Sequence, residues 1–310
     1  MKNNFKFIIC ICFIAIVFAT TSCAIRQVRD KKAEIKFSKE ADITISEDTQ
    51  WIYDLDLLSK QITVDNVDMY YDIIDNSDEI IKKMGFDKKD FKKEKKIFGN
   101  EDDEKYNTYS NGQLTVSDLG FFEYKTGQQM QMGVMKLSET EAVQKAKGFL
   151  QQYNLLNDNF DYTPIVSTAT ITQKNIETGE INEYVTEMTI AYYPKPIGEM
   201  NILGNSRITL AITDDGVRQM FYNYREYSQK KEVKLISVEQ ALEKAKKDEC
   251  MIELESLSAK LEISKVSLHY WEQALSSEIL VMQPVYVFTG TSTTEYGGEE
   301  EKFAITVQAN

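Results

Sequence analysis

The feature that most constrains the fold is a helix start that occurs twice, ninety-nine residues apart. Residues 136–147 (KLSETEAVQKAK) and residues 235–246 (LISVEQALEKAK) each place a serine three positions before a Glu or Gln. Such a pair forms a capping box, in which the serine oxygen accepts from a helical N–H and the longer side chain bonds the serine N–H. In both copies alanine then recurs after four residues, on a helix face that a sheet can approach closely. The copies predict two equivalent helices, each lying on a sheet.

Strand patterns follow each predicted helix. They cover residues 165–172 and 184–193 after the first helix, and residues 265–271, 279–289 and 303–307 after the second. Asn111-Gly112 and Asp214-Asp215-Gly216 are typical of tight turns, and each predicts a hairpin. Consecutive strands with short turns, interrupted by single helices, favour an α+β fold. We therefore expect tandem helix-plus-antiparallel-sheet modules behind an N-terminal signal and tether.

The expected organisation of the 310 residues has five parts. They are a lipoprotein-type signal peptide (1–22), a polar tether (23–48), an N-terminal α+β unit (49–134), a first module (135–235) and a second module (236–310).

The N-terminal segment has the order of a secretory signal. Lys2 and Lys6 precede an apolar run over residues 7–19, and three small residues (20–22) then lead to Cys23. The apolar run is short for a membrane span. Small residues directly before a cysteine resemble the lipobox of bacterial lipoproteins, which implies lipid attachment at Cys23. Thr20 departs from that pattern, because the family usually has an aliphatic residue there. The alternative is an uncleaved signal anchor, and either form places the protein outside the cell membrane and attached to it.

Charge excludes one class of partner. The formal net charge is −13, and nucleic acid requires a basic surface, so we expect no nucleic-acid partner. A lysine-rich run over residues 88–96 is followed by four consecutive acids at 101–104. Such a pair of runs usually forms a solvated helix face and a loop.

The residues of known catalytic patterns are sparse. His269 is the only histidine, no Gly-x-Ser-x-Gly turn occurs, and a strand pattern surrounds the histidine, which favours a strand-surface role. A metal site of paired histidines is impossible, and no nucleotide-binding glycine loop or calcium loop is present. We therefore expect no cofactor, no metal and no enzymatic activity. A pair of carboxylates acting as an envelope hydrolase stays open as an alternative, since that chemistry needs only Asp or Glu.

The paired capped helices, the run over residues 283–290 (QPVYVFTG) and the closing strand over 303–309 resemble PepSY-type repeats. Residues 110–310 as a whole resemble the extracytoplasmic accessory regulators of the YycH/YycI type, which are usually anchored by an uncleaved helix. This resemblance implies a membrane-anchored regulatory protein that acts on an envelope protein such as a sensor kinase. The alternative, which the PepSY resemblance would imply, is an inhibitor or chaperone-like partner of a secreted protease.

Exposed aromatic residues on a sheet are the candidate partner contacts. Alternation in residues 221–227 (FYNYREY) places Tyr222 and Tyr224 on one face, and His269 and Trp271 share a face of a later strand. Tyrosine and tryptophan are favoured as interface anchors, so these four residues are predicted to bind the partner. The alternative is that the tyrosines pack against a neighbouring module, because aromatic residues also dominate protein cores.

Overall fold

The computed structural model describes residues 48–97, 105–127, 134–174, 181–254, 258–272, 280–294 and 300–310. The predicted signal peptide, Cys23, most of the tether and the acidic run at 101–104 lie outside these ranges.

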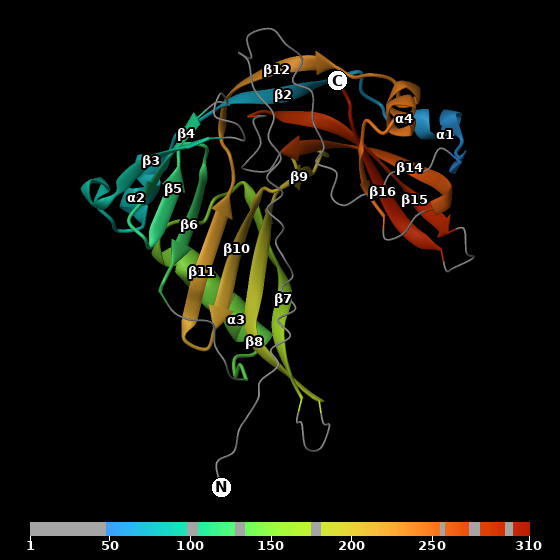
Figure 1. Cartoon of the computed structure of the whole chain (residues 1–310). Coiled ribbons are helices and arrows are strands. Elements are labelled where there is room, and N and C mark those ends of the chain that lie inside the picture. The colour runs from blue at the N-terminus through green and yellow to red at the C-terminus, as the bar shows by residue number, and fades with distance from the viewer. Residues whose placement is uncertain are drawn as a thin grey trace.

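Eight strands between residues 92 and 223 build one sheet, which we call the α3 sheet after the helix that covers it (Figure 1). All of its neighbouring strands run antiparallel. In spatial order the strands are β3 (Lys92–Ile97), β4 (Lys105–Ser110), β5 (Leu114–Ser117), β6 (Phe121–Lys125), β11 (Gly216–Asn223), β10 (Arg207–Thr213), β8 (Ile181–Pro194) and β7 (Phe160–Lys174).

A second eight-stranded sheet, the α4 sheet, combines the two ends of the described chain. Its central path is β1 (Gln50–Ile52), β14 (Ser258–Glu272), β15 (Met282–Thr294), β16 (Glu301–Gln308) and β13 (Met251–Glu253). Three more strands join it: β2 (Asn66–Ile73), β12 (Tyr227–Lys234) and β9 (Ile202–Gly204). The pairs of β1 and β9 with β14 are parallel, and the other pairs are antiparallel.

The described residues contain four α-helices and one short 3-10 helix. They are α1 (Leu55–Ser59), α2 (Ser77–Lys83), η1 (Lys88–Asp90), α3 (Glu139–Gln152) and α4 (Val238–Lys246). None of them is long and apolar enough to cross a membrane.

Both predicted capping boxes are confirmed. At the start of α3 the Glu141 N–H donates to Ser138 Oγ (3.3 Å), and the Ser138 N–H donates back to Glu141 Oε2 (2.8 Å). At the start of α4 the Gln240 N–H donates to Ser237 Oγ (3.1 Å), and the Ser237 N–H donates to the Gln240 amide oxygen (2.9 Å). Each box satisfies two backbone N–H groups that the first helical turn leaves without a partner.

Each of these helices contributes to a core of its own. The alanine face of α3 (Ala142 and Ala146) is fully buried in a cluster formed with the α3 sheet. The alanine face of α4 (Ala241 and Ala245) is buried in a second cluster, formed with the α4 sheet. The two clusters have no residue in common, so the described residues form two large, separate hydrophobic cores.

The predicted fold class is wrong. The described chain is mostly β-structure in two large, mainly antiparallel sheets, and not a tandem series of helix-plus-sheet α+β modules. The segment 49–134 explains the difference, because its strands enter both sheets: β6 pairs with β11, and β2 pairs with β12. The lysine-rich run also forms η1 and strand β3 where a helix was expected.

Candidate functional site at the sheet junction

The chain passes between the two sheets four times, and two of these passages are very short. Residues 205–206 lead from β9 of the α4 sheet into β10 of the α3 sheet, and residues 224–226 lead from β11 back into β12. We call the region around these two passages the junction. It lies where the two parts of the molecule meet in Figure 1.

Backbone and amide contacts connect the two passages to each other and to the end of β2. Asn223 at the end of β11 donates its amide N–H to the Asn205 carbonyl oxygen (2.8 Å). The Ile74 N–H, just after β2, donates to the carbonyl oxygen of Glu226 (2.8 Å). Glycine is required beside them at Gly204, which has a φ of +98° and where a Cβ would overlap the Glu272 carbonyl oxygen.

A buried ionisable group lies at the centre of the junction. Glu272, the last residue of β14, is only 3% exposed, and Arg225 is only 2% exposed. Tyr227 at the start of β12 donates its hydroxyl to Glu272 Oε1 (2.7 Å). The passage 224–226 is therefore fastened to the end of β14 by a hydrogen bond between residues 45 positions apart.

Burial dominates the electrostatics of this group. It raises the pKa of the Glu272 carboxyl above its ordinary value, and the Arg225 charge and the Tyr227 hydrogen bond offset only part of that rise. Burial, followed by the nearby Glu272 charge, likewise holds the pKa of Tyr227 well above its usual range. Removing one partner of such a group leaves the other buried and unsatisfied, which is costly. The arrangement therefore fits a structural role, in which Glu272 and Tyr227 hold β14 and β12 together.

Tyr222 does not have the exposed position that its predicted role requires. Its side chain is 8% exposed and belongs to the core beneath α3. Its ring stacks on Phe122 of the neighbouring strand β6, with 4.8 Å between ring centroids. The reason is that β11 is a central strand between β6 and β10, and this residue points to the helix-covered face.

Tyr224 lies at the edge of the same core and inside the junction. It is half-buried and contacts Phe160 edge-on, with ring centroids 5.0 Å apart. Burial raises the pKa of Tyr224 to about 12, and the charges of Glu226 and Glu272 add to the rise. The side chain is thus within electrostatic reach of the buried Glu272.

His269 and Trp271 occupy the face of β14 opposite to Tyr270. The Trp271 ring packs against Val285 and Val287 of β15. His269 Nε2 lies 2.8 Å from Ser267 Oγ, and burial, followed by the Lys265 charge, lowers the pKa of His269. Both effects favour the neutral form of the imidazole.

The structure does not bring the four predicted partner residues onto one surface. Tyr224 and Trp271 both border the junction, through their proximity to Glu272, whereas Tyr222 is in the α3 core. Sequence reasoning missed Glu272 itself. A signal was present, because Glu272 continues the alternation of Leu268 and Tyr270 and places an acid at a position of the core-facing series.

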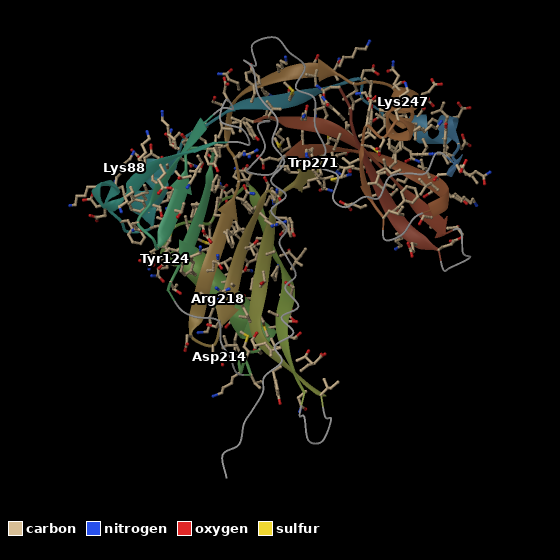
Figure 2. The ribbon with its side chains drawn as sticks, in the orientation of Figure 1. Lys88, Tyr124, Asp214, Arg218, Lys247 and Trp271 are labelled. Atoms are coloured by element: carbon tan, nitrogen blue, oxygen red, sulfur yellow. The ribbon has the colours of Figure 1, made fainter. Side chains whose placement is uncertain are left out.

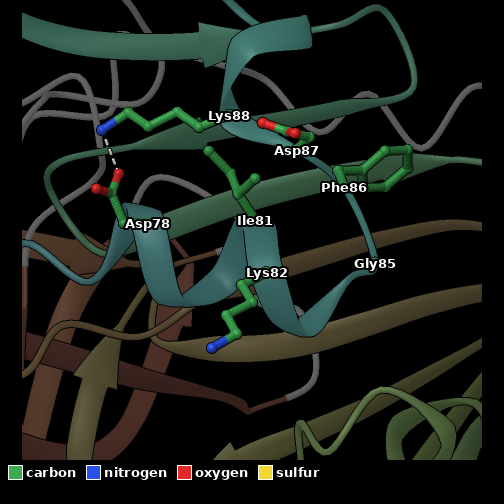
Figure 3. Close-up of a pocket in the computed structure, with 7 residues that line it drawn as sticks. All are labelled: Asp78, Ile81, Lys82, Gly85, Phe86, Asp87 and Lys88. Carbon is green, nitrogen blue, oxygen red and sulfur yellow. Dashed lines mark hydrogen bonds and ion pairs between the residues drawn. The ribbon is translucent and has the colours of Figure 1, made fainter.

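A shallow pocket lies elsewhere, between α2 and η1 (Figure 3). Its volume is about 410 Å³, and an ion pair between Lys88 and Asp78 lies at its rim. The lining residues are Asp78, Ile81, Lys82, Gly85, Phe86, Asp87 and Lys88. Positive and negative side chains alternate around it, so the pocket favours neither an anion nor a cation. Within the described ranges, no group of three or more His, Cys, Asp or Glu residues is placed to hold a metal ion.

The fold and the junction define a two-sheet β-protein with two cores and a buried polar connection. No protein-family model and no curated protein matches the chain. Among solved structures, an uncharacterized protein from Eubacterium rectale is similar with a TM-score of 0.37 and 13% identity, over 78% of this chain and 82% of that chain. YycH from Bacillus subtilis is similar with a TM-score of 0.36 and 10% identity, over 77% of this chain and 52% of that chain.

The sequence was expected to resemble regulators of the YycH/YycI type. The partial structural similarity to YycH agrees with that expectation for the fold. Similarity at this level carries no functional assignment. The lipoprotein and PepSY parts of the resemblance stay predictions, because no family match accompanies them.

Proposed function

We propose that this chain is an extracytoplasmic binding protein, held at the outer face of a bacterial membrane through Cys23, that regulates an envelope protein such as a sensor kinase. The N-terminal order of charged, apolar and small residues before Cys23 supports the location. Cys23 itself lies outside the described residues.

The observation that carries the regulatory part is the presence of two separate cores joined at a polar junction. Two bodies with their own cores can change orientation through a few residues at element ends, which is the usual construction of a hinge. The passages 205–206 and 224–226 have this character, since each is two or three residues long and each connects one sheet to the other. A partner that binds one sheet would then change the orientation of the other sheet and the surface that it exposes.

The partner contacts proposed for this function are Tyr224, His269 and Trp271, which are all partly exposed. Tyr224 and Trp271 border the junction, so a partner that contacts them would be sensitive to its geometry. Tyr222 supports this surface from the core.

Anchoring is tested by labelling cells with an alkyne fatty acid. The wild type should be labelled, Cys23→Ala should lose the label, and Cys250→Ala should retain it, because Cys250 is buried in the α4 core. Equal labelling of wild type and Cys23→Ala would contradict lipid attachment.

The partner is tested by placing a photo-crosslinking amino acid at position 224 in the full chain in living cells. A matched control carries it at Ile181, an exposed residue at the end of β8 away from the junction. A sensor kinase crosslinked at position 224 alone would support regulation. A secreted protease in its place would favour the inhibitor alternative, and identical products at both positions would contradict a partner surface at the junction.

A further inference from the structure

A second surface is distinguished by its charge. Between residues 82 and 96 the chain carries eight lysines and only three acids, although the whole chain has a net charge of −13. All eight lysines are exposed, and we call them together the lysine edge. Its members are Lys82, Lys83, Lys88, Lys89, Lys92, Lys93, Lys95 and Lys96.

The fold gathers these lysines at one end of the molecule. Within the described residues, strand β3 is the outermost strand of the α3 sheet and has β4 as its single neighbour. Helices α2 and η1 precede it directly. Figure 2 shows Lys88 at this end and Lys247, on the α4 side, at the opposite end. Along β3 the side chains alternate, so that Lys92 and Lys96 share one face and Lys93 and Lys95 share the other. The lysine side chains therefore point away from the edge in several directions.

Half of these charges lack a neutralising partner within the described part of the chain. Ion pairs join Lys83 to Glu79, Lys88 to Asp78, Lys89 to Asp87 and Lys96 to Glu94. No ion pair with a described residue is formed by Lys82, Lys92, Lys93 or Lys95, although Lys93 also lies 5.5 Å above the Tyr109 ring.

Protection of an exposed edge explains only part of this arrangement. Lysines on an outer strand prevent pairing with other chains, which accounts for those on β3. It does not account for Lys82, Lys83, Lys88 and Lys89, which lie on α2 and η1. The pocket between α2 and η1 includes Lys82 and Lys88, but it is shallow and its lining carries both signs of charge. A group of lysines spread over two helices and a strand therefore fits a broad anionic surface better than a shaped ligand.

We propose that the lysine edge docks on the anionic headgroups of the lipid bilayer that holds the protein. This inference rests on the membrane anchoring of the proposed function. Attachment at Cys23 leaves 24 residues before the first described residue, and at full extension they span roughly 80 Å, so the lysine edge can reach the bilayer. Attraction of lysines to anionic lipid acts within about 8–10 Å at physiological salt, and it weakens as salt is added.

Lysine acetylation of the full-length protein, purified from bacterial membranes and reconstituted in vesicles, tests the proposal. Vesicles of phosphatidylcholine are compared with vesicles that also contain about 30% phosphatidylglycerol, a fraction sufficient for a negative surface potential. The anionic vesicles should slow acetylation of Lys92, Lys93 and Lys95 by about tenfold, and high salt should restore it. Lys244 and Lys247 on the α4 side are internal controls and should react equally in both.

Charge-reversal variants provide the matched comparison. Lys92→Glu/Lys93→Glu/Lys95→Glu should abolish the lipid-dependent protection of the remaining lysine-edge residues. The control changes three exposed lysines of another outer strand, Lys230, Lys231 and Lys234 of β12, and should leave the protection intact. Unfolding midpoints of both variants identify any loss of folding, and the corresponding Lys→Gln variant then replaces the reversed one.

The outcomes separate this inference from the proposed function. Flotation with both kinds of vesicle but equal acetylation would overturn the docking and leave the anchoring in place. Failure to float with either kind would overturn the anchoring, and the docking with it. Protection by added polyphosphate but not by anionic vesicles would overturn the bilayer as the occupant and identify a soluble phosphate polymer.

Discussion

Tyr227 donates a 2.7 Å hydrogen bond to Glu272, a carboxyl that is almost completely buried. This bond joins the first residue of β12 to the last residue of β14, at the point where the chain enters the α4 sheet from the α3 sheet. The bond supplies a hydroxyl donor to the buried carboxyl, and its contribution to stability can be measured.

Replacing Tyr227 with Phe should lower the free energy of unfolding by about 1–3 kcal/mol, because the buried Glu272 carboxyl loses its hydroxyl donor while the ring is retained. Urea unfolding measures the change. Tyr193→Phe is the control, since that tyrosine is exposed, and it should change the free energy by less than about 0.5 kcal/mol. Equal effects of the two substitutions would contradict the importance of the bond.

Glu272 should also make stability depend on pH. Burial raises its pKa above the value of 4.5 expected in the unfolded chain, so the folded protein retains the proton more strongly. Its contribution is therefore complete below pH 4.5 and is lost as the pH rises through the raised pKa of the folded state. The slope is at most about 1.4 kcal/mol per pH unit for one proton.

The measurement compares the wild type with Glu272→Gln from pH 4 upward by urea unfolding. The exposed carboxylates with lowered pKa values, such as Glu141 and Asp161, act in the opposite direction but are common to both proteins. The stability of the wild type relative to the variant should therefore fall with rising pH. A stability difference between the two proteins that stays constant with pH would contradict a raised pKa of Glu272.

The two capping boxes should contribute equally. Ser138→Ala and Ser237→Ala should each cost about 1 kcal/mol, since each removes an acceptor for a helical N–H. Ser138→Asp and Ser237→Asp retain an acceptor and should stay close to the wild type in thermal unfolding. Alanine variants as stable as the aspartate variants would show that these serines add nothing as caps.

Tyr222 should behave as a core residue. Tyr222→Ala removes a ring stacked on Phe122 and should destabilise the protein by about 3–5 kcal/mol, whereas Tyr193→Ala should have little effect. Chemical denaturation of both variants provides the comparison. A small effect at Tyr222, together with lost crosslinking at position 224, would instead support a direct binding role.

Local signals in the sequence predicted local structure well. The structure confirms both capping boxes. They could be predicted because the two residues of each box are only three positions apart in the sequence. The turn at residues 214–216 is confirmed by the pairing of β10 with β11, and the Asn111-Gly112 turn by the pairing of β4 with β5. These features need no knowledge of the remainder of the chain.

Distant pairing could not be predicted in this way. Lysine and glutamate favour helices locally, but residues 92–97 pair with β4 and become a strand. Glu272 becomes buried only because β9 and β12 arrive from elsewhere in the chain. The surface expected at Tyr222 is covered for the same reason, since β6 and α3 enclose it from other parts of the sequence.

The strand pairing also has a consequence for the order of folding. The α3 sheet uses only residues 92–223, whereas Gln50 of β1 must wait for Lys260 and Asn66 of β2 for Lys234. In a chain that emerges from its N-terminus, the α3 sheet can assemble while the earliest strands still lack their partners. The same difference in sequence separation applies when the complete chain refolds, because β10 and β11 are adjacent in the sequence and β1 pairs with the distant β14. Pulsed hydrogen exchange during refolding should therefore protect β10 and β11 before β1 and β2. Strands β1 and β2, which are synthesised first, would therefore be the last to pair.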